Sequence, residues 1–236
     1  MIKKIIKKIK FFYYLNDLNN LFLANIKGFF LSKQKITFIQ IPRTTTTLIN
    51  ELIKKNIKNS KKIYTPNHYL KPKYCFLDNY FVTLRDPVER FVSAYYHLKN
   101  SQFITYYKDF FEKYPTIDAL ADKITLKRTK NYIRLSHHLN ENLNTFFSID
   151  VINKNKPIII IDNQYLKKDL KIFFSYFLNI KNINLNVVDN KKKITKKSIL
   201  KKKTKNKLKR FLAEDYLIYY ELKKIRKKIL NSLQKF

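Results

Sequence analysis

The stretch Tyr80–Asn100, YFVTLRDPVERFVSAYYHLKN, constrains the fold more than any other part of the chain. Its first five residues, YFVTL, are β-branched, aromatic or apolar and predict a buried strand. Asp86-Pro87 then predicts the start of a helix, because aspartate accepts hydrogen bonds from the first free backbone N–H groups and proline has no N–H to lose there. A strand followed at once by a helix is the repeating unit of an α/β fold.

The helix that begins at Pro87 has two different faces. Apolar residues at helical spacing predict its buried face: Val88, Phe91, Val92, Tyr95 and Leu98. Arg90 and Ser93 lie three residues apart on the other side, so we expect both to point away from the core. A bare α/β crossover needs neither Arg85 at the strand end nor Ser93 two turns into the helix. We therefore interpret the stretch as a ligand site.

A second strand–loop–helix unit precedes it. Lys35–Ile41, KITFIQI, predicts a buried parallel strand, and LINELIKKNIK after the loop Pro42–Thr47 predicts an amphipathic helix. Such a loop directs backbone N–H groups and the positive end of the helix dipole toward one point, which suits an anion.

The composition of the loop Pro42–Thr47 strengthens the anion prediction. Arg43 adds a fixed charge, and four hydroxyl groups follow it, on Thr44, Thr45, Thr46 and Thr47. One threonine would be enough to cap the helix, so four of them with an arginine favour an anion site. The loop lacks the glycines and the Lys-Ser/Thr pair of a Walker-type phosphate loop.

The rest of the chain continues the alternation of strands and helices. We expect a basic helical lead-in at 1–34, a loop with His68 at 58–73, mostly helices at 101–147, a strand at Ile158–Ile161, a helix at Leu166–Ile180, a solvated lysine-rich run at Asp189–Lys207 and one long helix at Leu208–Leu233. This order predicts one α/β domain, residues 35–236, around a central parallel sheet.

The net charge of +33 favours an anionic partner such as nucleic acid, but the residue usage offers a simpler source. Lys, Asn, Ile, Phe and Tyr dominate and glycine occurs once, as an A/T-rich coding sequence would produce for any function. The same bias makes arginine informative, since only seven of the 50 basic residues are Arg and three of these are Arg43, Arg85 and Arg90. Arginine holds phosphate or sulfate with two parallel hydrogen bonds, which lysine cannot do.

Cellular location is indicated by two features. Cys75 is the only cysteine, so no internal disulfide is predicted and a reducing, cytoplasmic compartment fits. The N-terminus, MIKKIIKKIKFFYYL, is basic and amphipathic, with apolar runs too short to span a bilayer. We expect a soluble protein, with peripheral membrane contact through this helix as the open alternative.

Four segments together resemble the sulfotransferase family, most closely in pattern the carbohydrate sulfotransferases of the heparan-sulfate 2-O-sulfotransferase type. IPRTTTTLI is similar to the family's 5′-phosphosulfate loop, and FVTLRDPVERFVSAYYH to its 3′-phosphate motif, an Arg-Asp-Pro with a serine eight residues after the arginine. IIIIDNQYLKKDL and LAEDYLIYYEL resemble a later strand–helix and a C-terminal acidic-aromatic helix. The resemblance extends from Lys35 to about Lys223 and is thin between Ser101 and Lys156.

The resemblance implies a P-loop-NTPase-like three-layer α/β/α domain and sulfuryl transfer from 3′-phosphoadenosine 5′-phosphosulfate to a carbohydrate hydroxyl, without a metal. It implies that Arg43 and Thr44–Thr47 bind the 5′-phosphosulfate, with Arg43 at the leaving oxygen, and that Arg85 and Ser93 bind the 3′-phosphate. His68 lies where the family places a histidine and is the candidate general base, since its intrinsic pKa suits that role. In the family a loop near Asn190–Lys193 closes over the donor.

The chain departs from the family pattern in the loop and at one later position. Arg43 replaces the usual lysine and Thr45-Thr46 replace small residues, which narrows the loop. Gln164 stands where a glutamate is usual.

Alternatives to the sulfotransferase reading remain open. They are a basic nucleic-acid-binding protein, a nucleotide kinase and a relative that binds nucleotide without catalysis. His97 is expected to be structural, and His137-His138 lack metal-ligand spacing.

Overall fold

The computed structural model describes residues 19–20, 22–27, 29–31, 33, 35–57, 62–65, 70–74, 76–101, 107–185 and 200–233. Within the lead-in, residues 19–20, 22–27 and 29–31 are helical. The predictions for the N-terminal fifteen residues, for His68 and for Asn190–Lys193 concern residues outside these ranges, as does Cys75.

The described strands form one parallel sheet. Its order is β2-β1-β3-β4, and the strands are β1 (Ile36–Ile39), β2 (Ile63–Tyr64), β3 (Tyr80–Leu84) and β4 (Ile159–Asp162). β3 pairs with β1 on one side and with β4 on the other, so β1 and β3 end next to each other. The predicted central parallel sheet is confirmed.

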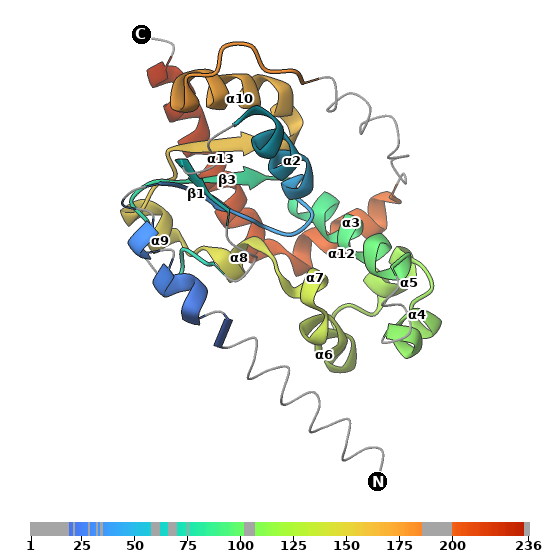
Figure 1. The fold of residues 1–236 in the computed structure, drawn as a ribbon. Coiled ribbons are helices and arrows are strands. Elements are labelled where there is room, and N and C mark those ends of the chain that lie inside the picture. The colour runs from blue at the N-terminus through green and yellow to red at the C-terminus, as the bar shows by residue number, and fades with distance from the viewer. Residues whose placement is uncertain are drawn as a thin grey trace.

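Both faces of this sheet are covered by helices, which makes three layers (Figure 1). Successive strand residues point to opposite faces, so a strand that is buried on both faces is apolar throughout. Phe38, Phe81 and Ile159 pack under α2 (Thr46–Asn56) and α10 (Leu166–Ile172). Ile39, Val82 and Ile160 pack against α8 (Leu143–Phe146), α9 (Ile149–Lys154) and α13 (Ala213–Leu233). The predicted three-layer α/β/α architecture is confirmed.

A group of helices lies beside the sheet and has a core of its own (Figure 1). Its members are α3 (Pro87–Lys99), α4 (Lys108–Lys113), α5 (Ile117–Asp122), α6 (Lys127–Leu135), α7 (His137–Asn140) and α12 (Lys202–Phe211). The buried face of α3 belongs to this core, and Val88, Phe91 and Tyr95 are at most 1% exposed. The predicted helical character of 101–147 is confirmed for the described residues 107–147.

Three boundaries differ from the sequence predictions. The loop expected at 58–73 contains β2, whose two residues pair with β1 and are too few to show a pattern. The helix expected at Leu166–Ile180 changes from α to π geometry at Phe173–Phe177. The expected single helix Leu208–Leu233 is two helices, α12 and α13, separated at Leu212.

The described part of the lysine-rich run includes a helix that the sequence did not predict. Lys202–Lys207 form the first turns of α12, and Lys202, Lys203 and Lys205 are exposed as expected. Thr204 and Leu208 are buried, and the Thr204 hydroxyl donates to Asp118 on α5. The helix forms because this buried stripe packs on α5 while lysine, a good helix former, fills the exposed positions.

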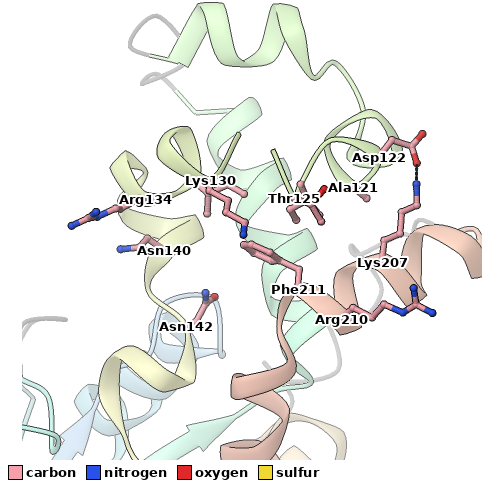
Figure 2. Close-up of a pocket in the computed structure, with 12 residues that line it drawn as sticks. Ala121, Asp122, Thr125, Lys130, Arg134, Asn140, Asn142, Lys207, Arg210 and Phe211 are labelled. Carbon is pink, nitrogen blue, oxygen red and sulfur yellow. Dashed lines mark hydrogen bonds and ion pairs between the residues drawn. The ribbon is translucent and has the colours of Figure 1, made fainter. Parts of the chain in front are cut away.

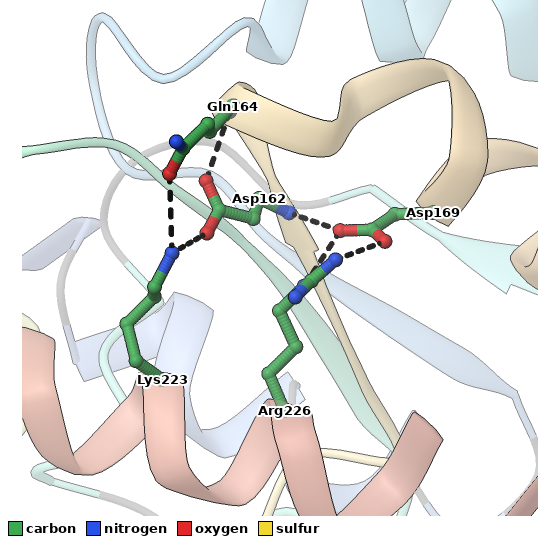
Figure 3. Close-up of polar contacts among 5 residues, drawn as sticks. All are labelled: Asp162, Gln164, Asp169, Lys223 and Arg226. Carbon is green, nitrogen blue, oxygen red and sulfur yellow. Dashed lines mark hydrogen bonds and ion pairs between the residues drawn. The ribbon is translucent and has the colours of Figure 1, made fainter. Parts of the chain in front are cut away.

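A polar network fixes α13 to the edge of the sheet (Figure 3). Arg226 donates two hydrogen bonds to the Asp169 carboxylate, of 2.8 and 2.5 Å, and Asp169 also accepts the Asp162 N–H at 2.8 Å. Lys223 pairs with Asp162 at 2.5 Å and lies 3.5 Å from the Gln164 amide oxygen. Each of the two buried carboxylates in this network therefore has a cationic partner, and the exposed Gln164 accepts a hydrogen bond from Lys223 of α13.

In the described part of the chain, no helix combines the length and apolar character that crossing a membrane requires.

Candidate functional site

Two strand–helix junctions meet at the carboxyl edge of the sheet. β1 leads through residues 40–45 into α2, and β3 leads through Arg85 and Asp86 into α3. Because β1 and β3 are parallel neighbours, the helix N-termini that follow them lie on the same edge (Figure 1). The sequence predicted an anion site at each junction, and the fold brings the two together.

The β3–α3 junction is built by local signals. The Asp86 carboxylate accepts the Glu89 N–H at 3.1 Å, and Pro87 occupies the first position of α3. The other Asp86 oxygen accepts the Tyr216 hydroxyl of α13 at 2.9 Å. Asp86 is thus the predicted helix cap and also a link between α3 and α13.

The β1–α2 loop has an unusual backbone. Arg43 and Thr45 adopt φ values of 66° and 68°, the left-handed region that glycine normally occupies. Each such residue costs about 1–2 kcal/mol. The Thr45 side chain makes no capping bond to α2, so the simple explanation of the threonines as helix caps does not hold at this position.

Thr44 holds the loop in place. Its hydroxyl donates to the Ile41 carbonyl at 2.6 Å and lies 2.5 Å from the Thr83 hydroxyl on β3. Thr44 is 1% exposed, so its hydroxyl is used inside the fold. Thr46 is also buried, whereas Thr47 is exposed in the first turn of α2. Of the four threonine hydroxyl groups predicted to bind an anion, the one on Thr44 instead holds the loop in place.

Two arginines converge where the junctions meet. Arg85 Nη1 donates to the Arg43 carbonyl at 3.2 Å, and Arg43 Nε donates to the Ser93 hydroxyl on α3 at 3.3 Å. These three residues, predicted separately from two motifs fifty residues apart, therefore form one contact cluster. We call Arg43, Arg85 and Ser93 the arginine cluster.

The arginine cluster is electrostatically unbalanced. The pKa of Arg43 is lowered by burial and by the charge of Arg85, and burial also lowers the pKa of Arg85. Within the described residues, one ion pair reaches this cluster, from Glu89 to Arg85 at 3.7 Å. Arg85 Nε is buried and has no hydrogen-bond partner among the described residues. The charges of Glu89 and Asp86 partly oppose the lowering of the Arg85 pKa, whereas no ion pair to Arg43 occurs among the described residues, so the cluster favours binding of an anion.

Arg90 does not point away from the core, as the sequence pattern suggested. It is 2% exposed and donates to the His138 carbonyl at 3.0 Å, to the Leu139 carbonyl and to the Asn142 side chain. Burial lowers its pKa to about 10, against the opposing effect of Asp215 and Glu141. The prediction was wrong because a helical pattern shows the polar face but not the α7–α8 segment that covers it.

His97 lies nearer to the site than its sequence position indicated. It follows Ser93 by four residues, so it shares the same face of α3. Burial and the charge of Arg43 both lower its pKa, and its ring lies 4.9 Å from that of His138. The spacing of Arg90, Ser93 and His97, which places all three on one face of the helix, was the sequence signal that could have identified His97.

No group of three His, Cys, Asp or Glu residues suited to a metal ion occurs among the described residues.

Comparison with known proteins gives one match. The model of a family described as the sulfotransferase family matches residues 10–155, which contain both strand–helix junctions. No curated protein and no solved structure matches the chain.

Proposed function

Because the chain belongs to the sulfotransferase family, we propose that it transfers a sulfuryl group from 3′-phosphoadenosine 5′-phosphosulfate to a carbohydrate hydroxyl. Family membership supports a transferase of sulfuryl groups in general. The choice of donor and of acceptor is our proposal, and it rests on the resemblance of the two motifs and on the geometry of the arginine cluster.

The observation that carries the proposal is the contact of Arg43 with Ser93. The donor has two separate anionic groups, a 3′-phosphate and a 5′-phosphosulfate. A site for it needs two cation-bearing loops within one ligand's reach, and Arg43 and Arg85 come from two such loops at one sheet edge. Arg85 and Ser93 would bind the 3′-phosphate, and Arg43 with the N-terminus of α2 would bind the 5′-phosphosulfate.

The reaction needs positioning and charge stabilisation more than covalent catalysis, as phosphoryl transfer does. The acceptor oxygen attacks sulfur while the bond from sulfur to the bridging phosphate oxygen breaks. The electron pair of that bond passes to the phosphate, where Arg43 would stabilise the added charge. Arginine supplies this charge but cannot donate its proton at neutral pH, so the acceptor proton must pass to another group.

His68 is our candidate for that group, and its role can be tested separately from donor binding. Replacement His68→Ala is expected to abolish sulfuryl transfer and to leave nucleotide affinity unchanged. His97→Ala serves as the matched comparison, because that histidine lies on the same helix face as Ser93. If His68→Ala retains turnover while His97→Ala loses it, the base is assigned to the wrong histidine.

Calorimetric titration tests the donor. Adenosine 3′,5′-bisphosphate is expected to bind about 100-fold more tightly than 5′-AMP, since one further phosphate gains charge-assisted bonds to Arg85 and Ser93. Arg85→Ala should remove this preference, and Lys54→Ala on the exposed part of α2 should keep it. Equal affinity of the wild-type protein for both nucleotides would contradict the proposal.

The second candidate is a relative that binds the nucleotide without catalysis, and one observation favours it. Thr45 is strained where the family pattern has a small residue, and Arg43, which replaces the usual lysine, is strained in the same loop. Bisphosphate binding without any transfer from the donor to a panel of carbohydrate acceptors would support this candidate.

A further inference from the structure

Four large apolar side chains are exposed on the helical residues that precede β1. Their exposed fractions are 64% for Phe22, 54% for Leu23, 43% for Ile26 and 63% for Phe30. Because an α-helix turns by about 100° per residue, these four positions fall within an arc of about 100° on one face. We call the four residues the N-terminal stripe. A contiguous apolar surface that faces water is typical of a protein or membrane contact.

Other side chains of the same helical residues fix the N-terminal stripe on the outside. Asn25 is buried, and its side-chain oxygen accepts the Lys71 N–H at 3.1 Å. The Lys27 ammonium lies over the Tyr64 ring of β2, 5.9 Å from the ring centre. These two contacts join the helical residues to the body of the protein, and the stripe is left facing away from it.

The sequence around the N-terminal stripe is strongly basic. Residues 1–35 contain eight lysines and one acidic residue, Asp17. The whole chain has 50 basic and 17 acidic residues, so this region is more one-sided in charge than the chain as a whole. Lys27 and Lys33 lie next to the stripe in sequence. The region therefore combines an exposed apolar face with an excess of positive charge.

We propose that the N-terminal stripe docks on the surface of an anionic lipid bilayer. A helix that lies in the membrane interface buries Phe, Leu or Ile in the lipid and carries lysine beside them. Anionic headgroups also supply the counter-charge for the lysines of residues 1–35. A second copy of this chain suits the stripe less well, because it would bring two lysine-rich segments together.

The proposed membrane contact lies away from the arginine cluster. The helical residues 19–31 lead into the amino end of β1, whereas Arg43 and Arg85 follow the carboxyl ends of β1 and β3 (Figure 1). Docking of the stripe therefore leaves the candidate site open to water. The contact is independent of the proposed sulfuryl transfer, and it restricts the protein to a surface without closing its site.

A second basic region offers an internal comparison. Lysines and arginines of α6 and α12 surround a hollow of about 690 Å³, among them Arg134 and Arg210 (Figure 2). None of the apolar residues that line this hollow is exposed. The hollow thus has positive charge at its edge without an exposed apolar face. Substitutions there separate the general attraction of a cationic protein to anionic lipid from docking by the stripe.

Binding of the full chain to lipid vesicles tests the proposal. The probes are vesicles of phosphatidylcholine alone and of phosphatidylcholine with about 30% phosphatidylserine, at low and at physiological salt. Partitioning onto the anionic vesicles is expected to be at least about tenfold stronger and to fall as salt rises. Equal partitioning onto the two kinds of vesicle, or none onto either, would overturn the proposal.

Paired substitutions of apolar residues locate the contact. Phe22→Ser with Phe30→Ser removes two rings from the stripe and is expected to weaken partitioning onto anionic vesicles by about tenfold or more. The matched control is Leu217→Ser with Tyr220→Ser, which removes two similarly exposed side chains from α13 and should change partitioning by less than about twofold. Unchanged partitioning in the first pair, or an equal loss in both pairs, would overturn the proposal.

A charge control uses the second basic region. Arg134→Ser with Arg210→Ser should weaken partitioning by less than about threefold, because these cations lie outside the proposed contact. A larger loss here than in the Phe22/Phe30 variant would assign the membrane contact to the hollow and overturn the proposal.

Two further measurements address the other possible occupant and the orientation. Sedimentation equilibrium should find a monomer, and a wild-type dimer that the Phe22/Phe30 substitutions dissociate would show that a second copy covers the stripe instead. Adenosine 3′,5′-bisphosphate should bind the wild type equally well with and without anionic vesicles. An affinity that depends on the vesicles would contradict a contact on the side away from the arginine cluster.

Discussion

The two junctions that form the candidate site reach similar positions by different means. At the β3–α3 junction, Asp86 and Pro87 give the helix a regular start. At the β1–α2 junction, Arg43 and Thr45 hold left-handed conformations, and the side chain of Thr45 makes no cap. The first geometry is encoded by adjacent residues, whereas the second is imposed by the Thr44–Thr83 contact with the next strand.

This difference indicates where the site can vary. A locally encoded junction keeps its shape when its surroundings change, so it suits a group that must fix the donor's register. A junction held by tertiary contacts stores strain, about 1–2 kcal/mol at each of Arg43 and Thr45, and conservative substitutions there can change its shape.

The largest expected effect is on the pH dependence of stability and concerns Asp215, a carboxyl group of α13 whose charge acts on Arg90 of α3. Burial raises the pKa of Asp215, beside Arg90, from 3.8 to about 6. The folded state then binds more protons than the unfolded state between these two pH values, so the free energy of unfolding falls as pH rises across this window. The loss is on the order of 3 kcal/mol. Denaturant titrations at pH 4 and pH 7 should show this fall in the wild type and a smaller one in Asp215→Asn. An identical pH dependence in the two proteins would contradict the assignment.

The next effect concerns the tertiary support of the β1–α2 loop. Thr44→Val leaves the Ile41 carbonyl and the Thr83 hydroxyl without this partner in a buried place, at a cost of about 2 kcal/mol. Thr44→Ser keeps the hydroxyl and should cost less. Adding Thr83→Val to Thr44→Val should recover part of the loss, because both partners are then apolar. A double variant less stable than the sum of the singles would show that the contact is not the support we infer.

The loss of stability on removing the helix cap of α3 should be smaller. Asp86→Ala removes the acceptor of the Glu89 N–H and of the Tyr216 hydroxyl, and we expect a loss of about 1.5 kcal/mol. Asparagine is an equally good cap, so Asp86→Asn should lose less than half of this amount. Thermal unfolding of the three proteins gives the comparison, and equal melting temperatures for the wild type and Asp86→Ala would show that the cap is dispensable.

The smallest expected effect is a gain in stability. Thr45→Gly relieves the left-handed conformation and should stabilise the protein by about 0.5–1 kcal/mol, after subtraction of the entropy that glycine adds to the unfolded chain. Thr47→Gly, in the regular first turn of α2, should instead destabilise by a similar amount. Bisphosphate affinity should rise in the first variant only. A loss of stability in both would mean that the loop is not strained at Thr45.

Sequence reasoning predicted those features that neighbouring residues determine. The run Tyr80–Leu84 is apolar because both of its faces are buried, and Asp86-Pro87 fixes the start of α3. The rarity of arginine in this lysine-rich chain predicted Arg43 and Arg85 as ligand residues, and the polar face of the helix after Pro87 predicted Ser93. Their roles stay predictions.

The features that sequence reasoning missed depend on distant partners. Arg90 is buried because α7 and the residue before α8 lie over it, and no local pattern records that cover. The left-handed Arg43 and Thr45 contradict local preference, since tertiary contacts hold them. The break between α12 and α13 at Leu212 carries no proline or glycine, so the continuous helical pattern concealed it.

The hydrogen bond from Tyr216 to Asp86 spans 130 residues and has a consequence for the order of folding. During synthesis the ribosome releases β1, α2, β3 and α3 long before α13. Until α13 is made, Asp86 lacks the Tyr216 hydroxyl and Arg90 lacks the charge of Asp215. All residues of the two junctions are therefore synthesised well before the helix that contacts them can fold against them. Donor affinity should appear late, when the last helix docks.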